Sequence, residues 1–280
     1  MKTMTTLKGL IGAAMAVASM VGGSMAQAQT TYEIYVGGTQ VTSTNAADIT
    51  GSWKKGGSVS YDDATKTLTL TNAVIESGDV QGIKSALDSL NVKLVGINTI
   101  TTTYASSVYN DMNGKMFITG DTLKAMCTQQ SAMFSSYFST LCIRDCYVEA
   151  EGMWGITGVT GFRDEVLKID HARVKATGTS FGSIQSFSQF LLSNCHIIMP
   201  TGAAWNEEYH AVCTGSDMVM NQAVVIMPDE PTGIALPHAE NATVKAIYDT
   251  TGRRLNEMRP GVNIVLYNDG STRKIWVRQQ

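Results

Sequence analysis

The stretch Leu141–Gly152, LCIRDCYVEAEG, decides the fold because the chain repeats its pattern. Copies begin every 23 to 28 residues. The first and third positions of every copy are apolar. The fifth position mostly holds a residue typical of a corner. The copies begin at Leu68, Val92, Met116, Leu141, Leu167, Phe190 and Met218. A repeat period in the twenties is typical of a solenoid, in which each turn buries its inner face against its neighbours.

Each position of the repeat has an expected place. Residues two positions apart lie on one face of a strand, so the first and third positions should point inward. The fifth position mostly holds residues that tolerate left-handed backbone angles, which predicts a corner. These residues are Asn72, Gly96, Gly120, Asp145, His171, Asn194 and Gln222. A strand, a corner and a second strand in seven copies predict a parallel β-helix. The leucine-rich repeat shares the period but needs its asparagine further along, so it is the less favoured solenoid.

The two ends of the chain have their own patterns. Residues 1–28 combine Lys2 and Lys8, an apolar run and the small residues of a cleavage site, as in a secretory signal peptide. We expect export to the outside or the outer surface of the cell, and no membrane span after cleavage. The alternating strands and turns of residues 29–67 predict a β cap for the exposed first turn.

The expected fold class is all-β: a right-handed parallel β-helix with an N-terminal β cap and a small C-terminal β-sandwich-like domain. The β-helix should occupy residues 68–228. A linker is expected over 229–240, because the stretch 227–238 contains three prolines. Residues 241–280 should form the C-terminal domain from alternating strands and tight turns.

Two segments resemble known families. YEIYVGGTQVTSTNAADI and GSVSYDDATKTLTLTNAVI resemble the opening of secreted bacterial carbohydrate-binding-domain-containing proteins. That group is similar to right-handed β-helix proteins that bind acidic plant polysaccharide. The C-terminal segment AIYDTTGRRLNEMRPGVNIVLYNDGSTRKIWV resembles the sorting domain of type IX secretion cargo. The second resemblance implies the secretion machinery as a partner, and its motif residues are Tyr248, Asp249, Gly252, Arg253, Arg254, Gly261 and Lys274.

Composition narrows the function classes. The formal net charge is −3, with no basic stretch, so we expect no nucleic-acid partner. The five cysteines are an odd number. Cys146 and Cys195 share one repeat position two turns apart, roughly 10 Å, which exceeds bridging distance. A pair between Cys127 and Cys213 stays open. No CxxC motif indicates a zinc site, and no metal or other cofactor is expected, apart from calcium as a minor alternative.

Two groups of residues are candidates for function. Trp154, Trp205, Tyr104 and Tyr137 lie between repeat copies and could stack on sugar rings, although such aromatics also seal a solenoid's flank. A charged patch on adjacent turns resembles the groups of pectin-cutting β-helix enzymes, but it also fits an outer-face ion-pair ladder. It contains Arg144, Asp145, Asp170, His171, Arg173 and Lys175. Stacking should bring Arg144 near Asp170, and Asp145 near His171.

These patterns favour a non-catalytic binding or adhesion module at the cell surface, with polysaccharide as the ligand implied by the resemblance. We expect no catalytic residues. The first alternative is a pectin-type polysaccharide lyase or hydrolase acting at the charged patch, and the second is a structural spacer or protein adhesin.

Overall fold

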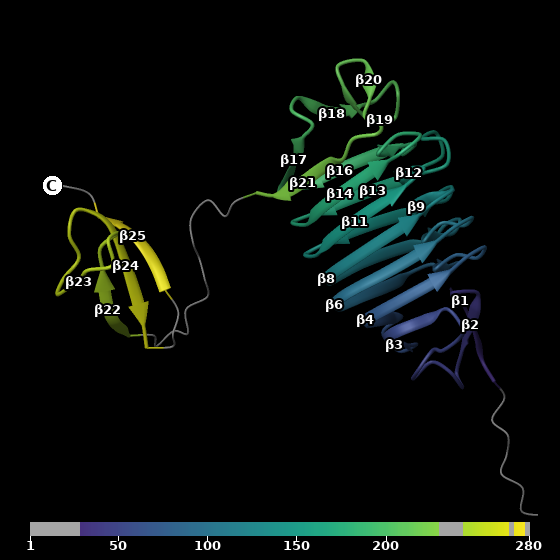
Figure 1. The fold of residues 1–280 in the computed structure, drawn as a ribbon, viewed down its shortest axis with the longest axis horizontal. Coiled ribbons are helices and arrows are strands. Elements are labelled where there is room, and N and C mark those ends of the chain that lie inside the picture. Colours follow the sequence, from purple (N-terminus) through teal and green to yellow (C-terminus); the bar gives the residue numbers. More distant parts are fainter. Residues whose placement is uncertain (1–28, 230–242, 269–271, 278–280) are drawn as a thin grey trace, which may run out of the picture.

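The computed structural model describes residues 29–229, 243–268 and 272–277. The expected signal peptide and almost all of the expected linker lie outside these residues. The described chain is all-β, as predicted. It forms a β-solenoid of about five turns, followed in sequence by a small four-stranded antiparallel sheet (Figure 1).

Each complete turn of the solenoid has three faces, and adjacent turns pair in parallel on all of them. The first face consists of the opening halves of β4 (Thr67–Ser77), β6 (Leu90–Thr102) and β8 (Lys115–Cys127), then β10 (Thr140–Arg144), β13 (Val166–Asp170) and β16 (Gln189–Ser193). The second face consists of the closing halves of β4, β6 and β8, then β11 (Tyr147–Gly152) and β14 (Arg173–Gly178). The third face consists of β5 (Ile83–Ser85), β7 (Val108–Asn110), β9 (Ser131–Ser135), β12 (Trp154–Thr157) and β15 (Ile184–Gln185).

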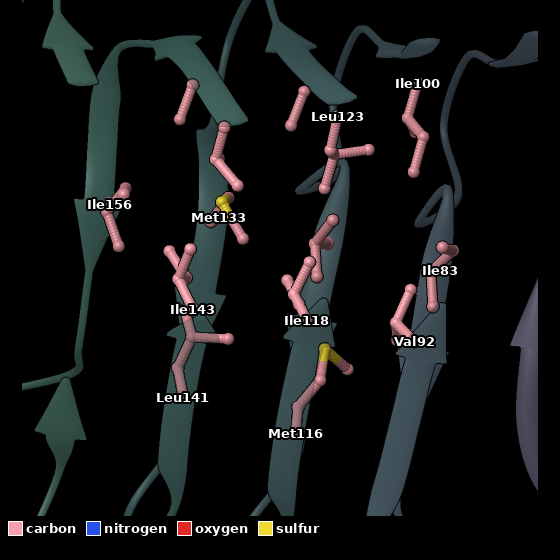
Figure 2. Packing of buried hydrophobic residues seen from close by; sticks show 14 of the residues in the cluster. Ile83, Val92, Ile100, Met116, Ile118, Leu123, Met133, Leu141, Ile143 and Ile156 are labelled. Atoms are coloured by element: carbon pink, nitrogen blue, oxygen red, sulfur yellow. The ribbon is translucent and has the colours of Figure 1, made fainter. Parts of the chain in front are cut away.

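The inward positions stack as continuous apolar columns. On the first face, Val92, Ile118 and Ile143 follow one another in register and are buried (Figure 2). Burying one such side chain contributes about 1.5–3 kcal/mol, and no turn could bury its own inner face alone. The predicted inward residues of the first five copies are all buried, whereas Phe190 and Leu192 of the sixth copy are only half-buried.

The predicted corners are confirmed by the backbone. The fifth-position residues of the first six copies all have positive φ, which short polar side chains and glycine adopt most readily. Asp145, for example, has φ of 50° and His171 has φ of 45°. In the seventh copy the left-handed residue is Asn221 and not Gln222, because that copy does not form a parallel turn.

The register between the second and third copies differs from the simple repeat. Val92 pairs with Ile118, and it is Leu90 that pairs with Met116. The corner of β6 also holds an extra residue, Ile97, which is 61% exposed. Because of this extra residue, Ile100 and not Thr99 is the partner of Ile75 in the first copy, which explains why Thr99 did not fit the apolar pattern of the repeat.

The solenoid ends differently from the seven-copy prediction. After β16 the chain forms β17 (Cys195–Met199), β18 (Ala203–Asn206), β19 (Ala211–Thr214), β20 (Asp217–Met218) and β21 (Val224–Pro228). Strand β21 runs antiparallel between β14 and β17, so the seventh copy is a reversed strand. Its first apolar residue, Met218, is half-buried and its third, Met220, is exposed. The apolar spacing alone could not distinguish this reversed strand from another parallel turn.

The first turn is covered by antiparallel strands. Strand β1 (Thr31–Val36) pairs with β2 (Thr39–Thr42) and with β5, and β3 (Lys54–Asp62) pairs with β4 across the predicted Asp62–Lys66 hairpin. Residues 243–268 and 272–277 form a separate sheet of β22 (Val244–Tyr248), β23 (Arg254–Leu255), β24 (Gly261–Tyr267) and β25 (Thr272–Val277). Where the sequence suggested a sandwich-like arrangement, the described residues form one antiparallel sheet.

All five cysteines are buried and unpaired, including Cys127 and Cys213. Cys146 and Cys195 fill the inner side of corners, and their thiols donate to the backbone carbonyls of Ile118 and Ile169, respectively. Burial raises the pKa of the Cys146 thiol to about 12. Across the ranges that the structure describes, no helix is long and apolar enough to cross a membrane.

Candidate functional site

A column of outward-facing side chains runs along the third face. Lys84, Tyr109, Phe134, Thr157 and Gln185 occupy successive strands in register. The rings of Tyr109 and Phe134 stack at 5.0 Å between centroids. The short Thr157 side chain then leaves a groove along β12, between Phe134 on one side and Gln185 on the other.

The groove has a volume of about 220 Å³, and one of its walls is aromatic. Trp154 begins β12 and stacks on Phe181, with ring centroids 4.1 Å apart and only 7° between the planes. Phe181 comes from the neighbouring turn and is 39% exposed. Stacking holds the indole ring in one orientation beside the groove, which favours contact with a flat apolar ligand surface.

The floor of the groove depends on a glycine. A Cβ atom on Gly158 would lie 2.0 Å from the backbone oxygen of Ser186 in the next turn, so only glycine fits. Thr157 donates its hydroxyl to the Gly158 carbonyl at 2.9 Å and therefore lies low on the strand. The backbones just after β12 and β15 therefore approach each other closely where these residues line the groove.

A buried carboxylate fixes the loop that closes one end of the groove. Glu165 is fully buried and accepts hydrogen bonds from the backbone N–H of Arg163 at 2.9 Å and from the Ser188 hydroxyl at 2.8 Å. Its other oxygen accepts from the N–H and hydroxyl of Thr160, both at 3.1 Å. Burial alone would raise the pKa of Glu165, but these bonds outweigh burial and hold the pKa below its usual range.

The other three predicted aromatic residues lie away from this groove. Tyr104 is 57% exposed in the loop before β7. Tyr137 lies after β9 beneath the Arg163 guanidinium, 5.1 Å from its ring centroid. Trp205 lies in β18, packs on Phe190 at the end of the solenoid, and has a buried ring nitrogen without a hydrogen-bond partner.

The charged patch lies on the exposed corner between the first and second faces. Arg144 and Asp170 are partners in register, and His171 Nδ1 lies 2.8 Å from Asp145 Oδ1, as the stacked repeat predicts. Asn194 in the next turn donates to Asp170 at 2.8 Å. The Arg144, Asp145 and His171 side chains are each more than half exposed. None of the five best-defined grooves among the described residues is lined by these side chains.

Arg173 and Lys175 of the patch belong to the second face and have their own partners. Lys175 bonds Glu149 at 2.8 Å across the turns, and this contact raises the pKa of Lys175 and lowers that of Glu149. Arg173 lies over the Tyr147 ring at 5.0 Å. The patch as a whole therefore has the geometry of a surface ladder. Most of its charges are partnered by an adjacent turn, and Arg144 lies 3.8 Å from Asp145 in its own turn.

The sorting-like motif builds the turns of the C-terminal sheet. Tyr248 ends β22, and the Asp249 carboxylate accepts from Thr251 and from the Arg253 N–H, which lowers the pKa of Asp249. Gly252 and Gly261 have positive φ, Arg254 begins β23, and Lys274 pairs with Ile264. Asn263 of β24 is fully buried, and its side chain hydrogen-bonds both the N–H and the carbonyl of Arg259.

Of the four aromatic residues predicted to bind a ligand, only Trp154 lies at the groove. The sequence analysis did not single out Phe134 and Gln185, which line the groove, or Phe181, which stacks on Trp154. Two signals were available: the alternation of Ser131, Met133 and Ser135 leaves Phe134 facing outward, and the segment around β12 contains Gly155 and Gly158. Within the described ranges, no three His, Cys, Asp or Glu side chains converge as a metal site would require.

The fold and the groove together define a capped β-solenoid with an aromatic, amide-lined hollow on one face. Comparison of the chain with protein-family models, with curated proteins and with solved structures finds no match in any of the three. Function is therefore inferred from the geometry of this groove.

Proposed function

We propose that the protein is a non-catalytic module that binds polysaccharide through the groove along β12. The observation that carries this proposal is the stacked Trp154–Phe181 pair beside a hollow with amide and hydroxyl groups. Sugar rings have an apolar face that packs on aromatic rings, while their hydroxyls need donors and acceptors at the rim. A shallow, open groove on a rigid solenoid face suits one segment of a long chain.

Export and display at the cell surface are part of the same proposal. They rest on the signal-peptide pattern and on the sorting-like motif, whose residues form the turns of a compact sheet. A surface module needs a stable scaffold that presents one face outward, and a capped solenoid supplies such a face.

The alternative of a pectin-type enzyme has less geometric support. A hydrolase needs two carboxyl groups that flank the scissile bond, separated by a water in inverting enzymes. In the charged patch Asp145 is engaged by His171, and Asp170 by Asn194. Both pairs lie on a convex corner, where a substrate would be open to solvent.

The proposal is tested by glycan binding of the full chain and of a Trp154→Ala variant, with product release measured in the same wells. We expect binding without new reducing or unsaturated ends, and a loss of affinity of about tenfold or more in the variant, because a stacked aromatic is removed. Tyr104→Ala is the matched control, since it removes an exposed aromatic away from the groove and should bind normally. Product that disappears in Asp170→Ala would instead establish the enzyme, and equal affinity of all variants would contradict the groove.

A further inference from the structure

The groove along β12 is lined without any ionisable side chain among the described residues that form it. Its polar groups come from Gln130, Ser131, Thr157, Gln185 and Ser186. Amide and hydroxyl groups can both donate to and accept from sugar hydroxyls. None of them can neutralise a carboxylate.

The orientation of one amide is fixed by the backbone. The N–H of Gly182 donates to Gln185 Oε1 at 2.7 Å, and because an N–H cannot accept, Oε1 must be the acceptor. Gln185 Nε2 donates to the Ser186 hydroxyl at 3.2 Å and retains a second hydrogen. Gln185 therefore presents a donor of fixed position at the groove wall, which suits a hydroxyl oxygen.

The nearest cation of the outward column is remote and already paired. Lys84 lies three strands from Thr157, roughly 14 Å at the usual strand spacing. Its ammonium group lies 3.1 Å from the Asp111 carboxylate. At moderate ionic strength, screening over that distance leaves little attraction for an anion in the groove.

We infer that the ligand of this groove is a neutral polysaccharide, one whose sugar units carry hydroxyls and no carboxylate. This inference rests on the proposed function and specifies its substrate class. A uronic acid unit would lose hydration in the groove without gaining an arginine or lysine partner, which is unfavourable. A neutral unit loses only hydroxyl hydration, which the amides and hydroxyls replace. The acidic polysaccharide implied by the family resemblance does not match this lining.

The test compares the full chain with soluble neutral glucans, mannans and xylans on one side and polygalacturonate and alginate on the other. Titrations are run at about 0.05 M and about 0.5 M salt, between which charge–charge attraction is strongly screened. We expect measurable affinity for at least one neutral glycan, unchanged within about twofold by salt, and none for the acidic glycans.

Two variants that each introduce one negative charge test whether neutral glycans bind in this groove. Gln185→Glu keeps an acceptor for the Gly182 N–H but replaces the donor with a carboxylate, so neutral-glycan affinity should fall by roughly tenfold. Gln189→Glu makes the same charge change on the exposed start of β16, outside the groove lining, and should bind as the parent does. Thermal melts of both variants confirm folding.

The outcomes separate the two ideas. Salt-sensitive binding of the acidic glycans alone would overturn the neutral class and leave a polysaccharide-binding module. Binding to no glycan in either set would overturn the proposed function together with this inference. Neutral binding that is unaffected by Gln185→Glu would overturn the assignment to this groove.

Discussion

At the scale of single residues, the groove depends on side chains whose partners lie in other turns. Glu165 is one case, because its oxygens accept from Thr160 and Arg163 of its own loop and also from the Ser188 hydroxyl of the next turn. A sequence position in a loop gives no sign of this role. The Ser188 hydroxyl reaches Glu165 only when the next turn is in place, so the full set of donors could not be predicted from the local sequence.

We expect Glu165→Gln to destabilise the fold by about 1–3 kcal/mol at neutral pH, because an amide nitrogen cannot accept from the Arg163 N–H or the Ser188 hydroxyl. The pKa of Glu165 is lowered in the folded state, so its stabilising contribution is present above the unfolded pKa, about 4.3, and is lost as pH falls through the folded pKa. Thermal denaturation from pH 7 to pH 3 measures both effects.

The variant itself supplies the comparison for the pH effect. The stability difference between the parent and Glu165→Gln should shrink as the pH falls below the ordinary glutamate range, because the parent carboxylate becomes protonated. A difference that stays constant down to pH 3 would contradict the assigned role.

At the scale of strands, the repeat predicted which faces point inward and where the corners lie. It did not predict the register between β6 and β8, because Leu90 and Val92 are both apolar and either could have been the first position of the copy. The direction of β21 could not be predicted either, because the apolar segment VVIM is compatible with a parallel and with an antiparallel strand. The outward column of the groove depends instead on the register of the third-face strands β9, β12 and β15, which lie outside the repeated pattern, and this explains why Phe134 and Gln185 were missed.

Asn98 compensates for the shifted corner of β6. The side chain is fully buried; Oδ1 accepts the N–H of Ala73 at 2.8 Å and Nδ2 donates to the Thr122 carbonyl at 3.2 Å. We expect Asn98→Ala to lower stability by at least about 1–3 kcal/mol, because buried backbone groups in two neighbouring turns lose their partner.

Urea denaturation measures this effect as a fall in the transition midpoint at constant slope. Ile97→Ala is the matched control, because Ile97 is adjacent but mostly exposed and should change stability by no more than about 0.5 kcal/mol. Equal midpoints for the Asn98 variant and the parent would show that water replaces the side chain.

At the scale of the whole molecule, the period of the repeat was sufficient for the fold class. The apolar positions of five copies, from Leu68 to Ile169, predicted the stacked core directly. The function class is harder to predict from the sequence. The residues that line one face of a solenoid are about 25 positions apart and share no local motif.

The proposed export is also a property of the whole chain. When the full chain is expressed in a bacterium with a type IX secretion system, we expect it outside the cell, beginning close after Ala28, and a variant lacking residues 243–280 to be retained. Cell fractionation with N-terminal sequencing measures this, and Trp154→Ala should be exported normally. Export of the truncated chain would contradict the sorting role.

The different ends of the solenoid constrain how such a protein can change length over evolution. Strands β1 and β3 close the first turn and the reversed β21 closes the last, so neither end can be extended without losing its closing strand. Turns between them pair in parallel with neighbours of the same shape. Duplication of an internal segment of one period would therefore add a turn and another outward row, while both ends stay intact.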